Sequence, residues 1–204
     1  MSVTLRLPKS AGRLPDRPLP DKQKRNILMD KTSFLQLKQV SEEIAAAFTR
    51  WESDLELIPL SRPNQNQEDI EKIETVTVEA LAHRLERNTV FLIYSGSRLV
   101  GEISYQIDPP HLFKKVKETA WIGITIGEKE ARGKGIGVQA MQFLEKQILD
   151  AGLKRIELGV FEFNKPAIAL YQKMGYVEIG RIKDFTFWNG RMWQDIRMEK
   201  FPGV

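Results

Sequence analysis

Glycines alternate with basic and apolar residues in the hexapeptide Arg132-Gly133-Lys134-Gly135-Ile136-Gly137. The apolar run at residues 120–126 before it predicts a buried strand. After it, apolar residues recur at the intervals of an amphipathic helix: Val138, Met141, Leu144 and Ile148. A strand, a glycine-rich turn and a helix together direct backbone N–H groups and the positive end of a helix at one point. The sequence therefore predicts a phosphate-binding site, to which Arg132 and Lys134 add positive charge.

Two other phosphate-binding motifs fit these residues less well. A P-loop requires Gly-x-x-x-x-Gly-Lys-Ser/Thr, but Glu128 stands at the first glycine and Gly135 replaces the hydroxyl residue. The dinucleotide pattern Gly-x-Gly-x-x-Ala matches residues 135–140, and Glu157 follows about 20 residues later. Residues 127–131, however, separate these glycines from their strand, and Glu157 falls inside the next strand. The hexapeptide alone also fits an ordinary flexible loop before a helix.

The chain after this helix carries a second pattern. Gly152 is placed to end the helix. A half-buried strand is expected next, because Ile156, Leu158 and Val160 alternate with other residues. A further helix is predicted within residues 164–176, with Asn164 as its N-cap, Pro166 in its first turn and Gly175 at its end.

These two segments together resemble the GNAT superfamily of N-acetyltransferases. Residues 132–137 match the family loop Arg/Gln-x-x-Gly-x-Gly/Ala at every defined position, and residues 164–176 are similar to the signature Asn-x-x-Ala-x-x-Leu-Tyr-x-x-x-Gly-Phe/Tyr. The resemblance covers roughly residues 34–201. It implies an α/β (α+β) fold with a mixed, largely antiparallel central sheet of about seven strands, about four flanking helices and a splayed strand that binds the cofactor.

Alternation and capping residues predict the other elements. Before the glycine loop we expect, in chain order, a strand at residues 34–40, a helix at 41–52, a polar loop at 61–69, a helix near 77–87, and strands near 90–94 and 99–107. Near the end of the chain, Asn189-Gly190 is the preferred pair for a two-residue type I′ turn. It predicts a hairpin of residues 181–188 and 191–200.

Composition narrows the class of protein. A chain of 204 residues that is 42% hydrophobic fits one domain with a sizeable core. The absence of cysteine excludes disulfides and thiolate catalysis. No apolar run approaches the length of a transmembrane helix, and the N-terminus lacks the apolar core of a signal peptide. The default expectation is a cytoplasmic protein that does not use a membrane.

The net charge of +4 comes from residues 1–31, which hold eight Lys or Arg and three Asp. Four prolines interrupt this segment, so we expect a mobile or surface-draped extension followed by a GNAT-like domain at residues 32–204. A nucleic-acid arm, a solubilising extension and a translated leader ahead of Met29 all fit the segment. The remainder of the chain lacks the broad basic face of a nucleic-acid binder, so no nucleic-acid partner is expected.

The resemblance implies acetyl-CoA as cosubstrate and no metal. The pyrophosphate would lie over the amides of residues 133–138, and the pantetheine arm beside the strand at residues 121–126. An N–H of that strand would polarise the thioester carbonyl. The implied cofactor-binding residues are Ile124 and Ile126 through their main chain, Arg132, Gly133, Lys134, Gly135, Ile136, Gly137, Val138, Asn164 and Tyr171.

The implied reaction is direct attack by a primary amine on the acetyl group in a ternary complex. The amine must be neutral to attack, although a free lysine-like amine has a pKa of ~10.4. Glu102 is our candidate base, and an exposed strand charge is its alternative interpretation; Glu118 and His111 are weaker candidates. Tyr171 matches the family's tyrosine that assists the departing thiolate, whose pKa lies near ~8.5, and a packing role is its alternative.

Two classes of function stay open at this point. One is an N-acetyltransferase whose amine acceptor is a small metabolite or amino acid, a polyamine, an antibiotic or a protein N-terminus. The other is a non-catalytic acetyl-CoA-binding sensor, and a homodimer fits either class. Trp51, Trp121 and Trp188 are candidates to line an acceptor pocket. Fold analogy does not identify the acceptor.

Overall fold

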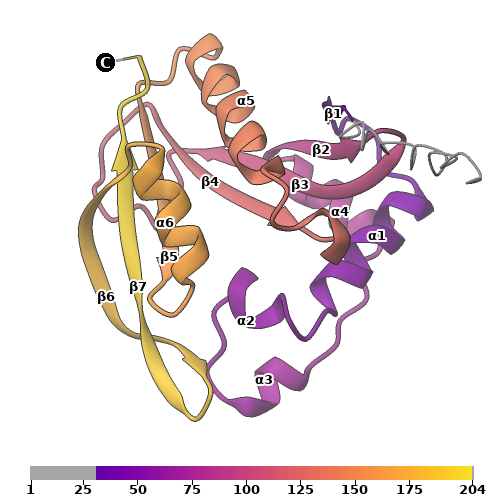
Figure 1. Ribbon diagram of the computed structural model, residues 1–204, viewed down its shortest axis with the longest axis horizontal. Coiled ribbons are helices and arrows are strands. Elements are labelled where there is room, and N and C mark those ends of the chain that lie inside the picture. Colours follow the sequence, from indigo (N-terminus) through magenta and orange to yellow (C-terminus); the bar gives the residue numbers. More distant parts are fainter. Residues whose placement is uncertain (1–30, 204) are drawn as a thin grey trace, which may run out of the picture. The chain divides into compact units, whose positions relative to one another are not determined.

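The computed structural model describes residues 31–203. Apart from Lys31, the predicted basic extension therefore lies outside the described residues. Seven strands form one sheet in the order β1-β2-β3-β4-β5-β7-β6 (Figure 1). They are β1 (Thr32–Gln36), β2 (Thr89–Ser95), β3 (Arg98–Ile107), β4 (Thr119–Ile126), β5 (Arg155–Phe161), β6 (Val177–Trp188) and β7 (Arg191–Lys200). Strands β4 and β5 run parallel and the other neighbours antiparallel, which confirms the predicted mixed, largely antiparallel sheet.

Residues 31–203 contain six α-helices, whereas about four were expected. They are α1 (Glu42–Glu52), α2 (Ile58–Ser61), α3 (Gln67–Glu71), α4 (Val78–Leu85), α5 (Ile136–Asp150) and α6 (Lys165–Lys173), with a 3-10 turn at Lys129–Ala131. The two extra helices, α2 and α3, are single turns: α2 ends at residue 61, where the predicted polar loop begins, and α3 overlaps the end of that loop. Such short turns leave no periodicity to detect, although Asn66 caps α3 by accepting the Asp69 N–H at 2.9 Å. None of these helices is long and apolar enough to cross a membrane.

Helices cover both faces of the sheet. Apolar residues of α5 pack on one face in a cluster that includes Met141, Leu144 and Ile148, and α6 joins the same cluster through Tyr171. Helices α1 and α4 pack on the other face through a second cluster that includes Phe48 and Leu81. The predicted amphipathic pattern of α5 is thus confirmed.

Strand β5 differs from its prediction as a half-buried strand. Its charged residues Arg155 and Glu157 are as buried as its apolar ones, with 1% and 0% of their surface exposed. Arg155 Nε donates to Glu199 at 2.7 Å, and Glu157 accepts the backbone N–H of Phe113 at 2.5 Å. The loop between β3 and β4 therefore covers this face and supplies partners for the buried charges, as their desolvation requires.

The parallel ladder between β4 and β5 is short. It joins Thr119 to Arg155, Ala120 to Ile156 and Trp121 to Glu157, and then ends. From there β4 continues along β3, while β5 continues along β7. The two strands diverge as Figure 1 shows, with α2 across the open end. The residues of β4 beyond Trp121 thus have a strand partner on one side, which is the splay that the resemblance implied.

The last hairpin has the predicted turn. Asn189 and Gly190 both have positive φ angles, 50° and 80°, as a type I′ turn requires. The strand before the turn also contacts the loop between α2 and α3, because Phe187 N–H donates to the Asn64 carbonyl at 2.7 Å and Thr186 Oγ1 accepts the Asn64 N–H at 3.0 Å. These bonds hold the α2–α3 loop against β6, the strand at the edge of the sheet.

One contact between the sheet and α1 generates a stability prediction. A Cβ on Gly127, at the end of β4, would lie 2.3 Å from atoms of the Trp51 ring. Gly127→Ala is therefore expected to destabilise the fold by about 1–3 kcal/mol through overpacking. The matched control is Gly123→Ala in the same strand, where the nearest atom is Ser104 Oγ at 3.7 Å. Chemical denaturation of both variants checks this, and equal stabilities would contradict the packing of Trp51 on Gly127.

Candidate active site

The loop before α5 presents a row of free amides. Gly133 and Gly135 have φ angles of 72° and 80°, and a Cβ at either position would meet no atom within 4 Å. Gly135 is the N-cap of α5 and has no side chain to cap it. Among residues 31–203, no acceptor lies within hydrogen-bond distance of the amides of residues 133–138. Open space, left-handed backbone and unpaired N–H groups at a helix N-terminus make an anion-binding nest.

Arg132 connects the glycine loop to the end of β4 and to the α1–α2 loop. Its Nη2 donates to the Gly127 carbonyl at 2.7 Å, and its Nε donates to the Ile126 carbonyl at 3.0 Å. The guanidinium also forms ion pairs with Asp54 at 2.9 Å and Glu56 at 3.1 Å. These contacts neutralise its charge and fix the start of the loop to the end of β4. The charge that Arg132 was expected to add at the mouth of the site is thus paired with two carboxylates of the α1–α2 loop, and its part in cofactor binding stays a prediction.

The other sequence-predicted cofactor residues occupy distinct places. Lys134 is exposed beside the nest, whereas the Ile136 side chain is buried in the core and offers its backbone alone. Ile124 pairs with Ile103 of β3 and has no partner in β5. The Ile126 carbonyl accepts a hydrogen bond from Arg132 Nε, and the expected contact of the Ile126 main chain with a cofactor stays a prediction. Asn164 caps α6 by accepting the Ala167 N–H at 3.3 Å.

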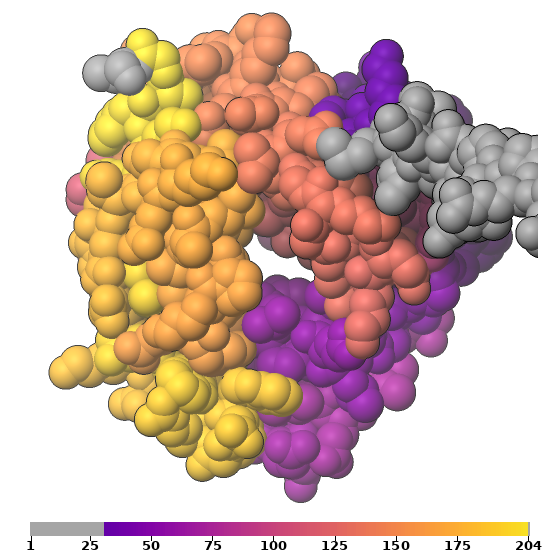
Figure 2. All heavy atoms as spheres, in the orientation of Figure 1, coloured from indigo at the N-terminus to yellow at the C-terminus, as the bar shows by residue number. Residues whose placement is uncertain are grey.

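An opening lies beside the nest. In Figure 2 it passes between the salmon segment that leads into α5, the orange segment of α6 and the purple segment of α2. This is where β4 and β5 diverge. Helix α6 reaches the nest, since a Cβ on Gly137 would lie 3.5 Å from Leu170 Cδ2. The next residue, Tyr171, is 8% exposed and packs at 5.9 Å, between ring centroids, from Tyr176.

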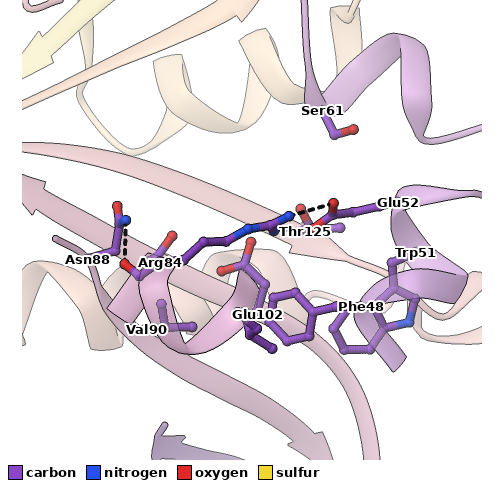
Figure 3. A pocket seen from close by; sticks show the side chains of 11 residues that line it. Phe48, Trp51, Glu52, Ser61, Arg84, Asn88, Val90, Glu102 and Thr125 are labelled. Carbon is purple, nitrogen blue, oxygen red and sulfur yellow. Dashed lines mark hydrogen bonds and ion pairs between the residues drawn. The ribbon is translucent and has the colours of Figure 1, made fainter. Parts of the chain in front are cut away.

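A pocket of about 170 Å³ lies on the other face of the sheet. It has a floor of β2, β3 and β4 and walls of α1, α2 and α4. Its lining residues are Phe48, Trp51, Glu52, Ser61, Leu81, Arg84, Asn88, Val90, Glu102, Ser104 and Thr125. Figure 3 shows the Glu102 carboxylate in the middle of this pocket, close beneath the extended Arg84 side chain. The pocket therefore surrounds one of the sequence-predicted catalytic candidates.

The environment of Glu102 shifts its protonation into the neutral range. Burial raises the pKa of this carboxyl group to about 7, and the charge of Glu52 adds to the increase. Hydrogen bonds from Ser104 and Thr125 and the charge of Arg84 oppose it. A carboxylate that gains and loses its proton near pH 7 is suited to general-base catalysis.

Arg84 and Glu52 close one side of this pocket. Both terminal nitrogens of Arg84 donate to the Glu52 carboxylate, Nη2 to Oε2 at 3.0 Å. These hydrogen bonds raise the pKa of the Arg84 guanidinium. Neither residue was predicted from the sequence, because the two lie 32 residues apart in the chain, at the ends of two different helices. A usable signal existed for α1, where Phe48, Trp51 and Glu52 have the three- and four-residue spacing of one helix face.

A chain of contacts connects the pocket around Glu102 to the nest. Trp51 lines the pocket, and its Nε1 donates to Glu128 at 3.0 Å. Glu128 follows Gly127, whose carbonyl accepts from Arg132. This chain of contacts links the pocket wall to the start of the glycine loop.

The remaining candidates lie elsewhere. His111 is exposed and packs edge-on against Trp121 at 4.7 Å, and Glu118 forms a surface ion pair with Lys154. Trp188 lies in the last hairpin near Phe163. Trp121 and Trp188 therefore do not line the pocket, while Trp51 does. Within residues 31–203, no group of three His, Cys, Asp or Glu side chains is arranged to hold a metal ion.

Comparisons with known proteins agree with this geometry. Residues 45–176 match the model of the acetyltransferase (GNAT) family. The chain is 47% identical over 45 residues to an uncharacterized N-acetyltransferase of Bacillus subtilis, and 33% identical over 98 residues to a probable spermine N(1)-acetyltransferase of Bacillus subtilis subsp. natto. These matches span 22% and 48% of this chain, and 29% and 63% of those proteins.

Among solved structures, spermidine N-acetyltransferase from Vibrio cholerae in complex with CoA and spermine is similar in fold. The TM-score is 0.64 at 18% identity, over 84% of this chain and 95% of that one. The family model covers more than half of the chain and includes the glycine loop, the splayed strand and the helix with Tyr171. The protein belongs to the GNAT family of acetyltransferases.

Proposed function

We propose that this protein transfers the acetyl group of acetyl-CoA to a primary amine. The observation that carries the proposal is the position of the splay between β4 and β5, with a phosphate-sized nest of free amides at one side and a pocket around Glu102 on the other face. The nest fits the pyrophosphate of a coenzyme A ester, because residues 133–138 offer consecutive N–H donors and no side chain obstructs Gly133 or Gly135. When bound there, acetyl-CoA supplies an activated acyl thioester.

The residues of the chain prepare the acceptor. An amine enters as an ammonium ion, which the Glu102 carboxylate attracts. Glu102, with its pKa of about 7, takes the proton and leaves the amine neutral for attack. Main-chain N–H groups of β4 beyond Trp121, including Ile124, are the donors proposed to stabilise charge on the acyl oxygen.

Tyr171 is proposed to assist on the opposite face. It belongs to the apolar cluster beneath α5, whereas Glu102 belongs to the pocket beneath α1 and α4. Burial raises the pKa of Tyr171 to about 12, so its hydroxyl group stays protonated at neutral pH and can donate a hydrogen bond to a leaving thiolate. A base and a hydrogen-bond donor on opposite sides of the gap suit direct transfer in a ternary complex.

The names of related proteins indicate acceptors to test first. A probable spermine acetyltransferase and a spermidine acetyltransferase are among the similar proteins, so polyamines belong in the panel beside monoamines, amino acids and peptide N-termini. Release of free CoA thiol from acetyl-CoA measures turnover. Tight acetyl-CoA binding without thiol release on any amine would instead identify a cofactor sensor.

The pH dependence of this assay tests Glu102. We expect kcat/KM to fall below about pH 7 as Glu102 becomes protonated, and Glu102→Gln to lower kcat/KM by about 100- to 10,000-fold. The residual activity of the variant should lack this acidic limb. An acidic limb near pH 7 that persists in Glu102→Gln would assign the base to another group.

The stability of Glu102→Gln at different pH values is a second test of the raised pKa of Glu102. A carboxyl whose pKa is raised on folding binds its proton more tightly in the folded state, so it costs increasing stability as the pH rises from about 4.5 to about 7. Glu102→Gln should therefore increase the melting temperature at pH 8 relative to the wild type, and much less at pH 4. Equal changes at the two pH values would contradict a raised pKa.

Gly135 tests the nest. At about 100-fold above its Kd, acetyl-CoA is expected to raise the melting temperature by about 5–10 °C. Gly135→Val should abolish this increase, because a β-branched residue does not adopt a φ of 80° and the loop amides would turn away. Gly152→Val is the matched control at the other end of α5, with a φ of 78° and open space. It should lose stability but keep the acetyl-CoA response; a retained response in Gly135→Val would refute the nest.

Tyr171→Phe separates hydrogen bonding from packing. The substitution keeps the ring and should lower kcat by about 10- to 1,000-fold while acetyl-CoA affinity stays nearly unchanged. Steady-state kinetics and a binding titration measure the two quantities. Wild-type kcat in this variant would assign Tyr171 to core packing.

A further inference from the structure

The charged residues that line the pocket are unequal in number. Among residues 31–203 these are Glu52, Glu102 and Arg84, which make two potential anions and one cation. The other lining side chains are apolar or carry hydroxyl or amide groups. With Glu102 ionised, the pocket therefore has a formal charge of −1. This charge balance favours a cation over a neutral or anionic ligand.

The one cation that lines the pocket, Arg84, already forms an ion pair with Glu52. Arg84 presents both of its terminal nitrogens to the two oxygens of Glu52, in the bidentate geometry by which an arginine recognises a carboxylate. Figure 3 shows this pair spanning the pocket above Glu102, with Arg84 extended toward α1. A carboxylate on a ligand would have to displace Glu52 or approach Arg84 from its remaining edge, where the negative charge of Glu102 also acts.

We propose that the Arg84–Glu52 pair selects acceptors that bear no carboxylate next to the reacting amine. Such acceptors are simple alkyl and arylalkyl amines, polyamines, and the terminal amines of peptides. Free α-amino acids are excluded, because their carboxylate lies one carbon from the amine and would face Glu52 and Glu102 with no free cation. The inference rests on the proposed function, since it places the acceptor amine at Glu102.

The proposed selectivity depends on whether the Arg84 guanidinium is already bound by a carboxylate of the protein. Glu52 accepts the two hydrogen bonds from Arg84 that the carboxylate of an amino-acid substrate would otherwise accept. Replacing Glu52 by glutamine frees the fork of Arg84 and leaves one cation and one anion in the pocket, which is the complement of a zwitterion. Glu52→Gln should therefore convert a pocket that rejects amino acids into one that accepts them.

Three ligands separate the effect of a carboxylate's charge from the effect of its size. Phenethylamine and phenylalanine differ by the carboxylate alone, and phenylalaninamide keeps the bulk of that group without its charge. Binding of each to the CoA-saturated full-length protein is measured by calorimetry at pH 8, and kcat/KM is measured with acetyl-CoA. The binding arm does not require turnover, so it tests selection even if acetyl transfer fails.

The wild type is expected to bind phenethylamine and phenylalaninamide at least about 10-fold more tightly than phenylalanine. Glu52→Gln should strengthen phenylalanine binding by about 10- to 100-fold, the value of a charge-assisted bidentate contact, and affect phenylalaninamide much less. Arg84→Gln removes the cation and should reject phenylalanine as the wild type does. Glu178→Gln, which breaks the exposed Arg181 pair on β6 with the same change of charge, is the matched control and should bind like the wild type.

Thermal melting of each variant establishes that it is folded before the comparison is made. Equal wild-type affinity for phenylalanine and phenethylamine would overturn the inference, as would a Glu52→Gln variant with an unchanged preference. Selective binding without thiol release on any amine would support the selection and refute acetyl transfer. Equal thiol release with amines and amino acids would support acetyl transfer and refute the selection.

Discussion

The end of the β4–β5 ladder is the constraint on which the site depends. Three residue pairs join these parallel strands, after which each follows its antiparallel neighbour on the other side. Backbone groups inside a sheet are normally paired, so a strand edge left free within the fold is a place where a ligand can supply the missing partners. The gap is also an opening that connects the two faces of the sheet. The nest before α5 lies beside the opening that Figure 2 shows, and the pocket beneath α1 and α4 is lined by Thr125 of β4 and Ser61 of α2.

Arg132 shows how the fold holds this gap open. Its guanidinium binds two carbonyls at the end of β4 and two carboxylates of the α1–α2 loop. The same turn contains Glu128, which accepts the indole N–H of Trp51 from the pocket wall. Ion pairs with this degree of exposure contribute little to global stability. Their effect is on geometry: they set the glycine loop and the pocket wall relative to one strand end, so the proposed cofactor and acceptor sites depend on the same few contacts.

The pocket pairs two carboxylates with opposite roles. Glu102 is desolvated and has its pKa raised to about 7, which costs stability and suits it to the proposed role of a base. Glu52 is held by Arg84, so its charge is used in an ion pair. The difference comes from position, because Glu102 lies on the central strand β3 and Glu52 on the last turn of α1. A carboxyl group that titrates near pH 7 and an arginine occupied by Glu52 support the proposal of a site for cationic amines.

The local features of this protein followed from the sequence. Glycine spacing, the Asn164 cap and the Asn189-Gly190 turn were readable because each acts within a few residues. They placed most strands and the longer helices, and the family signatures placed the glycine loop. The tertiary structure decided what depends on distant partners. It engaged Arg132 with Asp54 and Glu56, buried both faces of β5, and joined Arg84 to Glu52 across two helices. A side chain's charge, pKa and accessibility are set by the groups around it, and those groups come from parts of the chain that local patterns do not connect.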